Sequence, residues 1–137
     1  MNIKKIRTVV ILAAGLGSRM KSINDKIHKC LLPIENKAIL SKIIDKFPKN
    51  TKFIIAVGHK KRQIINFCKI VHKDLNIKFL NIKNYSSKNS GPGHSLLQSK
   101  KIVKSPFYFT TSDTLFENIK FDKIYFKNWV AVSKNII

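Results

Sequence analysis

The chain of 137 residues carries 27 lysines and arginines against 7 acidic residues, for a formal net charge of +20, and 44% of its residues are hydrophobic. This length suits one packed domain, and this hydrophobic content excludes a chain that stays disordered. No apolar run approaches the roughly 18 residues that cross a bilayer, and the two cysteines, Cys30 and Cys68, exclude a disulfide framework. The lysines are spread over nearly every segment, so we interpret them as solvated surface charges. The alternative is that their summed field attracts anionic ligands, including phosphates.

Apolar segments rich in β-branched residues alternate with segments of helical period, which is typical of an α/β fold with a mainly parallel sheet. In chain order we expect a strand at 7–14, a helix at 36–47, a strand at 52–58, a helix at 60–75, a strand at 77–82, a helix at 94–103 and strands at 106–112 and 128–133. The basic and apolar start resembles a secretory signal only loosely, because its short apolar run ends in a glycine loop. We therefore expect one cytoplasmic, Rossmann-like three-layer domain over residues 1–137.

Three polar stretches follow the predicted strands at the same edge of the sheet. They are the loop after the first strand, the loop near Gly91 and the residues after Phe109. In open parallel sheets, ligands bind beyond the carboxyl ends of the strands. The sequence therefore predicts a ligand site where these three stretches meet.

The stretch "AAGLGSRM" brings two glycines and an arginine to the end of the first strand. Gly15 and Gly17 permit backbone conformations that other residues avoid, and their amides can approach an anion closely. Arg19 adds a planar, permanently charged donor group, so the loop is a candidate phosphate cradle. It is not a P-loop, because no Gly-Lys-Ser/Thr closes it. It is not a dinucleotide fingerprint either, because Met20 stands where a third small residue is needed.

A longer pattern, "LAAGLGSRM" followed by "HKCLLPIENKAIL", resembles the N-terminal signature of the nucleotidyltransferase family that activates sugar phosphates and related phosphorylated compounds. Members carry a lysine, usually after a proline, shortly before "LLPI" or a similar run; Lys29 takes that position and His28 replaces the proline. "SGPGHSLLQS" is similar to the family's loop and helix start, whose backbone binds the nucleobase edge, which implies base contacts at Gly91 and Pro92. "FYFTTSD" ends at the position of the family's magnesium-binding carboxylate, Asp113.

The resemblance implies the nucleotide-diphospho-sugar transferase-like fold and an Mg²⁺-dependent reaction. A nucleoside monophosphate would move from a nucleoside triphosphate, with CTP or UTP favoured, to a phosphorylated acceptor such as a sugar phosphate, and pyrophosphate would leave. Arg19 and Lys29 are the implied catalytic residues, and Asp113 is the implied metal ligand. The residues implied to bind the nucleotide are Leu12, Ala13, Ala14, Gly15, Gly17, Ser18, Gly91 and Pro92. Apart from the resemblance, Asp113 is the one acid of the sequence that follows a predicted buried strand at its carboxyl end.

Other interpretations of these residues remain open. The glycines at 15 and 17 suit a plain tight turn, Lys29 suits a surface position, Asp113 suits a helix N-cap, and Gly91 suits a plain loop. The chain as a whole is alternatively a non-catalytic nucleotide-binding fragment or sensor, or a basic nucleic-acid-binding module. Catalytic domains of the family usually extend further, so we expect the C-terminal, acceptor-binding side to be incomplete here.

Overall fold

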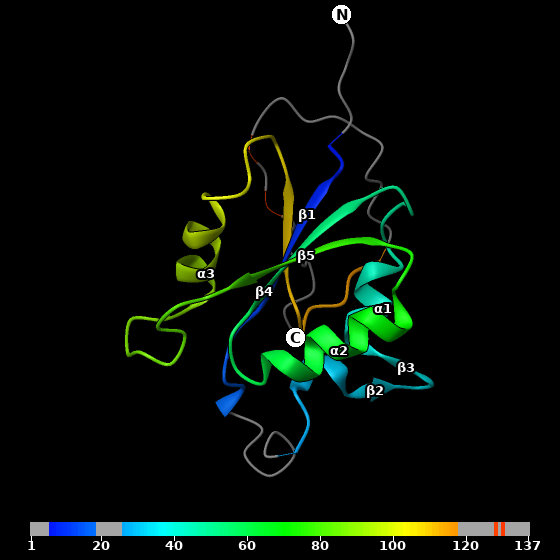
Figure 1. Cartoon of the computed structure of the whole chain (residues 1–137), viewed down its shortest axis with the longest axis horizontal. Helices are drawn as coiled ribbons and strands as arrows, with labels where there is room; N and C mark the ends of the chain where they lie inside the picture. The colour runs from blue at the N-terminus through cyan, green and yellow to red at the C-terminus, as the bar shows by residue number, and fades with distance from the viewer. Residues whose placement is uncertain (1–5, 19–25, 118–127, 129, 131–137) are drawn as a thin grey trace, which may run out of the picture.

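A four-stranded parallel sheet forms the centre of the computed structural model, which describes residues 6–18, 26–117, 128 and 130 (Figure 1). Its strands are β1 (Thr8–Ala13), β4 (Lys52–Val57), β5 (Asn76–Asn81) and β6 (Tyr108–Thr111), in the spatial order β5-β4-β1-β6. The central strand β1 pairs with both neighbours; Leu12, for example, lies opposite Ala56 of β4 and Thr111 of β6. The predicted α/β fold with a mainly parallel sheet is confirmed.

Helices and a small hairpin complete the described elements: α1 (Ile39–Ile44), α2 (Lys61–Val71), α3 (Pro92–Ser99), the 3-10 turn η2 (Lys29–Leu31), β2 (Pro33–Ile34) and β3 (Lys37–Ala38). The helix expected at 36–47 begins only at residue 39, because β3 pairs with β2 across a turn in which Glu35 has a φ of 59°. Helix α3 begins two residues before its expected start, since proline suits the first helical position. The strand expected at 128–133 lies almost entirely outside the described residues. None of the described helices is long and apolar enough to span a membrane.

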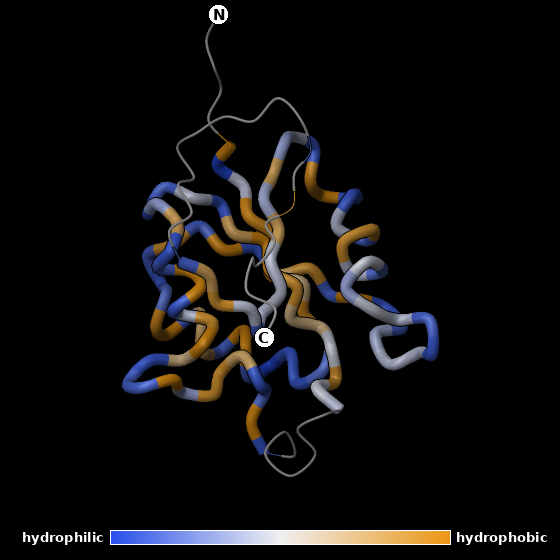
Figure 2. Tube along the Cα trace, turned by 180° about the vertical axis from the view of Figure 1, so that it is seen from behind, coloured by the Kyte–Doolittle hydropathy of each residue, from blue (hydrophilic) through white to orange (hydrophobic). Residues whose placement is uncertain are grey.

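The sheet is covered on both faces, which gives the domain three layers. One face of β1, including Ile11, packs with Leu40 of α1 and Ile64 of α2. The opposite face, including Leu12, packs with Leu96 of α3. Figure 1 shows α1 and α2 on one side of the sheet and α3 on the other, and Figure 2 shows apolar residues along the central strands. This double coverage explains why the first strand is apolar throughout rather than alternating.

The order of the strands creates a switch point between β1 and β6. From β1 the chain moves outward to β4 and β5 over the α1–α2 face, then returns through α3 on the opposite face to place β6 beside β1. Crossovers on opposite faces leave a crevice between the carboxyl ends of these two strands. The pairing continues past β6, because the amide of Ser112 donates to the carbonyl oxygen of Leu12 at 3.1 Å. Residues that follow both strands are therefore held side by side.

Gly58, the residue after β4, lies against the ring of Tyr85. A Cβ added at Gly58 would lie 2.7 Å from ring atoms of Tyr85 and 2.9 Å from the carbonyl oxygen of Ala14. We expect Gly58→Ala to lower the free energy of unfolding, measured by urea denaturation, by about 1–3 kcal/mol, because the ring or the backbone must shift. Gly93→Ala is the control: its Cβ would meet nothing within 4 Å in α3, so no loss is expected. Equal stability of the two variants would contradict the close packing at Gly58.

Candidate functional site

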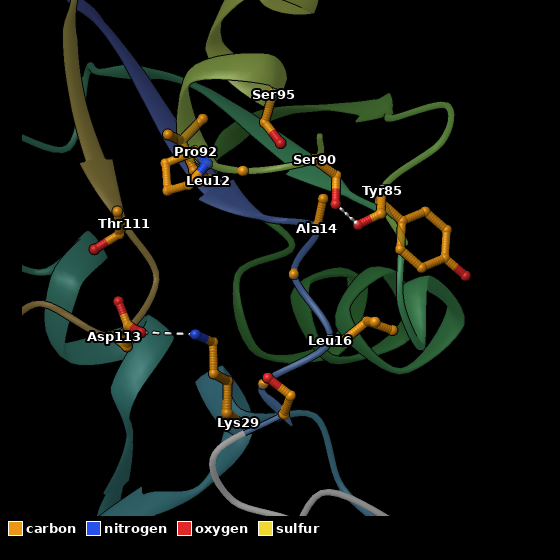
Figure 3. Close-up of a pocket in the computed structure, with 14 residues that line it drawn as sticks. Leu12, Ala14, Leu16, Lys29, Tyr85, Ser90, Pro92, Ser95, Thr111 and Asp113 are labelled. Atoms are coloured by element: carbon orange, nitrogen blue, oxygen red, sulfur yellow. Dashed lines mark hydrogen bonds and ion pairs between the residues drawn. The ribbon is translucent and has the colours of Figure 1, made fainter. Parts of the chain in front are cut away.

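A cavity of about 270 Å³ lies at the switch point, beyond the carboxyl ends of β1 and β6 (Figure 3). Its wall comes from the end of β1 and the following loop, from η2, from the loop before α3 with the start of that helix, and from the end of β6. The parallel sheet brings these distant segments together because its strands end at one edge. Nine of the predicted site residues line the cavity: Leu12, Ala14, Gly15, Gly17, Ser18, Lys29, Gly91, Pro92 and Asp113.

Two predicted site residues are not among those that line the cavity. The side chain of Ala13 is buried with the α1–α2 face of the core, because successive side chains of a strand point to opposite faces. Its neighbours Leu12 and Ala14 belong to the α3 face and reach the cavity. Arg19 lies outside the described residues, so its catalytic role stays a prediction.

The two glycines of the loop contribute in different ways. Gly17 has a φ of 65°, a left-handed conformation that favours glycine. Gly15 does not have a positive φ, and a Cβ added there would meet nothing within 4 Å. The expectation of an unusual backbone therefore holds for Gly17 and is wrong for Gly15. At Gly15 the missing side chain leaves the wall of the cavity open to a ligand.

Lys29 and Asp113 form an ion pair in the wall, with Nζ of the lysine 2.6 Å from Oδ2 of the aspartate (Figure 3). Their side chains are 21% and 50% exposed, so the pair can be reached from the cavity. Burial raises the pKa of Asp113, but hydrogen bonds from Lys29 and Thr111 and the lysine charge lower it by more. The net pKa lies below the ordinary value, and Asp113 is ionised at neutral pH. The site thus holds a fixed carboxylate beside an ammonium group.

The turn that carries Lys29 is held by the buried residue before it. His28 is the N-cap of η2: its Nδ1 accepts a hydrogen bond from the amide of Cys30 at 3.2 Å. Its own amide donates to Oε1 of Gln63, in the first turn of α2, at 2.8 Å. His28 therefore caps the turn with its side chain, which a proline at this position could not do.

The start of α3 forms the wall that faces Lys29 across the cavity in Figure 3. Gly91 is the N-cap with an extended backbone, Pro92 is the first helical residue, and the amide of Ser95 donates to the carbonyl oxygen of Gly91 at 3.2 Å. A Cβ added at Gly91 would meet nothing within 4 Å, so the backbone here is accessible. The partial positive charge of the helix N-terminus favours an anionic ligand in the cavity.

Five lining residues lie outside the predicted set: Leu16, Tyr85, Ser90, Ser95 and Thr111. The positions of two of them could have been inferred from spacing in the sequence. Thr111 precedes Asp113 by two residues, the spacing that places side chains on one face of a strand, and Ser95 lies four residues after Gly91, about one helical turn. Tyr85 depends on tertiary contacts, since its ring packs on Gly58 and its carbonyl oxygen accepts a hydrogen bond from Ser90 at 2.6 Å.

The fold agrees with comparisons to known proteins. The chain belongs to the MobA-like NTP transferase domain family, which matches residues 9–117. This match includes every described strand of the sheet except the first residue of β1. The resemblance to nucleotidyltransferases inferred from the motifs is therefore confirmed.

Individual relatives point to the same family. The bifunctional protein GlmU of Methanococcus vannielii is 32% identical over 126 residues, which cover 91% of this chain and 29% of the relative. The D-glycero-alpha-D-manno-heptose 1-phosphate guanylyltransferase of Campylobacter jejuni is 31% identical over 110 residues, which cover 79% of this chain and 48% of the relative. The chain thus spans less than half the length of either relative.

Two solved structures show the same fold. UDP-glucose pyrophosphorylase complexed with UDP-glucose superposes with a TM-score of 0.64 at 22% identity, over 79% of this chain and 46% of that one. CTP:phosphocholine cytidylyltransferase from Streptococcus pneumoniae superposes with a TM-score of 0.59 at 22% identity, over 84% of this chain and 49% of that one. The nucleotide-diphospho-sugar transferase-like fold expected from the sequence is confirmed.

Burial of His28 makes stability sensitive to mildly acidic pH. Burial is the largest cause that lowers the pKa of His28 to about 4, and the charges of His59, Lys29 and Lys60 lower it further. The backbone of Gly15 raises the pKa, but by less. Between pH 6.5 and 4 the unfolded chain therefore binds more protons than the folded chain. The free energy of unfolding falls as the pH decreases through this window. Urea denaturation at several pH values should show that the free energy of unfolding of His28→Asn falls less with decreasing pH than that of the wild type. An identical pH slope in wild type and variant would contradict the lowered pKa of His28.

Proposed function

We propose that this chain is the nucleotide-binding part of a nucleotidyltransferase that moves a nucleoside monophosphate from a nucleoside triphosphate to a phosphorylated acceptor. The observation that carries the proposal is the ion pair of Lys29 and Asp113, with 2.6 Å between Nζ and Oδ2, in the switch-point cavity. It lies beside a glycine loop and faces the N-terminus of α3. Together these groups suit a polyphosphate and its counterion: the ammonium and amides for phosphate oxygens, the carboxylate for a cation.

The chemistry requires alignment and charge neutralisation rather than a nucleophile on the protein. A phosphate oxygen of the acceptor attacks the α-phosphorus of the triphosphate, the bond from that phosphorus to the oxygen bridging to the β-phosphate breaks, and pyrophosphate leaves. In our proposal the loop at 15–18 holds the triphosphate, with Arg19 as the predicted further donor, and Lys29 neutralises the phosphate oxygens. The backbone at Gly91 and Pro92 contacts the nucleobase edge.

Mg²⁺ is the proposed cofactor, and Asp113 is its proposed protein ligand. The described residues contain no group of three or more His, Cys, Asp or Glu residues that could hold a metal. A single, half-exposed carboxylate suits Mg²⁺, which commonly binds one or two protein carboxylates together with substrate phosphates and keeps several waters. When bound, the ion would neutralise charge on the phosphate oxygens. The residues present therefore fit a metal that binds together with the nucleotide.

The proposed donor is CTP or UTP, and the proposed acceptor is a sugar phosphate or a similar phosphorylated compound. Names of similar proteins support this acceptor class, since they include a heptose 1-phosphate guanylyltransferase and a phosphocholine cytidylyltransferase. These two enzymes are named for different nucleobases, guanine and cytosine. The donor triphosphate of this chain must therefore be identified by experiment. We propose the cytoplasm as the location, because nucleoside triphosphates are available there.

Thermal unfolding with CTP, UTP, GTP and ATP, each with and without Mg²⁺, tests the donor. We expect one triphosphate with Mg²⁺ to raise Tm, because a ligand that binds only the folded state stabilises it. Asp113→Asn should remove the Mg²⁺-dependent part of the shift and lower pyrophosphate release, with a panel of phosphorylated acceptors, by on the order of 10²-fold. Asp45→Asn is the matched control, because Asp45 also pairs with a lysine at 2.6 Å, but outside the cavity.

Other outcomes of this experiment separate the alternatives. Binding of a triphosphate without pyrophosphate release, with every acceptor, would favour a nucleotide-binding fragment or sensor. Salt-sensitive binding to duplex DNA without any triphosphate shift would favour a nucleic-acid-binding module. Full activity of Asp113→Asn would contradict the proposed metal role.

Lys29→Met should change metal binding and nucleotide binding in opposite directions. Without nucleotide, we expect the variant to bind Mn²⁺ several-fold more tightly, because the ammonium no longer competes for the carboxylate of Asp113. With the triphosphate, the variant should bind the metal–nucleotide complex more weakly, since a phosphate contact is lost. Electron paramagnetic resonance of free Mn²⁺ measures both affinities. Lys37→Met, which removes the lysine of the control pair with Asp45, should change neither. Weaker Mn²⁺ binding by Lys29→Met both without and with the triphosphate would contradict competition between the ammonium group and the metal for Asp113.

A further inference from the structure

The segment that leads into Lys29 is fixed to α2 by one glutamine side chain. Gln63 accepts the amide hydrogen of His28 at Oε1, at 2.8 Å, and donates from Nε2 to the carbonyl oxygen of Lys26, also at 2.8 Å. These two bonds hold the main chain on both sides of residue 27. The segment from Lys26 to Lys29 therefore has a defined path next to α2.

The ring of His28 then fixes the turn itself. Nδ1 of the ring accepts a hydrogen bond from the amide of Cys30. The backbone carbonyl oxygen of His28 accepts another from the amide of Leu31 at 2.9 Å, which closes the first turn of η2. His28 is 1% exposed, so this cap is shielded from competing water. A shielded cap restricts the backbone of Lys29, whose side chain begins inside the capped turn.

The other ring nitrogen of His28, Nε2, carries the proton of the neutral ring. An amide can only donate, so Nδ1 must accept and the neutral ring carries its proton on Nε2. Nε2 is buried and has no hydrogen-bond partner in the part of the chain that the structure describes. The backbone of Gly15 nonetheless lies close enough to favour the protonated form of this ring, without forming a bond of good geometry. The imidazole of His28 thus lies between the Lys29 turn and the glycine loop.

We propose that His28 is a positioning residue: through its shielded cap on η2 it holds Lys29 where it meets Asp113 and the phosphates of the ligand. This inference rests on the proposed phosphate-binding role of Lys29. His28 does not line the cavity, so it acts through Lys29 rather than on the substrate.

Labelling of lysine amines tests the proposal without any nucleotide. The protein is treated briefly with acetic anhydride, and modification at each lysine is measured by peptide mass spectrometry. We expect His28→Ala to raise the labelling rate of Lys29 by about fivefold, as expected for a lost cap. Lys37 is the internal control, because it pairs with Asp45 at the same 2.6 Å distance but does not line the cavity. Unchanged labelling of Lys29, or an equal rise at Lys37, would overturn the proposal.

A conservative variant separates the cap from general packing. His28→Asn should restore the protection of Lys29 to within about twofold, because the asparagine Oδ1 can accept from the Cys30 amide as a usual N-cap does. If His28→Ala does not fold, His28→Gln replaces it, since its longer side chain is a poor cap. Failure of His28→Asn to protect Lys29 in the folded protein would show that the cap is not how His28 acts.

A double-mutant cycle then connects the turn to nucleotide binding. Triphosphate affinity is measured by calorimetry for wild type, His28→Ala, Lys29→Met and the double variant. We expect His28→Ala to weaken binding about tenfold in the wild-type background and to have little effect once Lys29 is replaced. Equal losses in both backgrounds would overturn the inference. A wild-type chain that binds no triphosphate would contradict the proposed function instead, while the labelling experiment would still decide the role of His28.

Discussion

Pairing of β1 with both β4 and β6 is the constraint on which the site depends. Six register pairs connect β1 with β4 and four connect it with β6, all in parallel. Parallel pairing brings the ends of these strands to one edge, and opposite crossovers open a crevice there. The crevice holds Gly15 after β1 and Asp113 after β6 within one cavity. Apolar burial on both faces of β1 stabilises this arrangement, so the core and the site are built by the same strand.

Charge acts in this protein at two different ranges. The net charge of +20 comes from lysines throughout the sequence, and its summed field attracts anions without selecting among them. Within the cavity the local arrangement is different, because Lys29 is already paired with Asp113. A ligand with phosphates and a divalent cation can satisfy both groups at once, whereas a simple anion leaves the carboxylate unpaired. The pair therefore offers a physical basis for preferring a metal–polyphosphate complex over other anions.

Two residues that only the structure connects to the site act through neighbours. Tyr85 reaches the cavity wall because Gly58 leaves space for its ring, and His28 reaches the turn of Lys29 because its ring is buried against Cys30. The contact of Tyr85 with Gly58 has no period or spacing that could be read along the chain, whereas the cap of His28 on Cys30 spans only two residues. The place of Tyr85, the burial of the His28 ring and the bond from the His28 amide to Gln63 depend on distant segments brought together by the fold, so a single sequence could not reveal them.

The sequence by itself determined the α/β class, the four strands of the described sheet and most residues around the cavity. The class and the strands follow from continuous apolar runs and helical spacing. The cavity residues follow from the resemblance of the motifs to the family, together with small or charged residues directly after strands. Only the tertiary structure decided that residues 37–38 join a hairpin rather than a helix, that Ala13 faces the core, and that Lys29 pairs with Asp113. Each of these depends on contacts between segments distant along the chain or on the face that a strand presents. Local propensity leaves such choices open, and packing around β1 makes them.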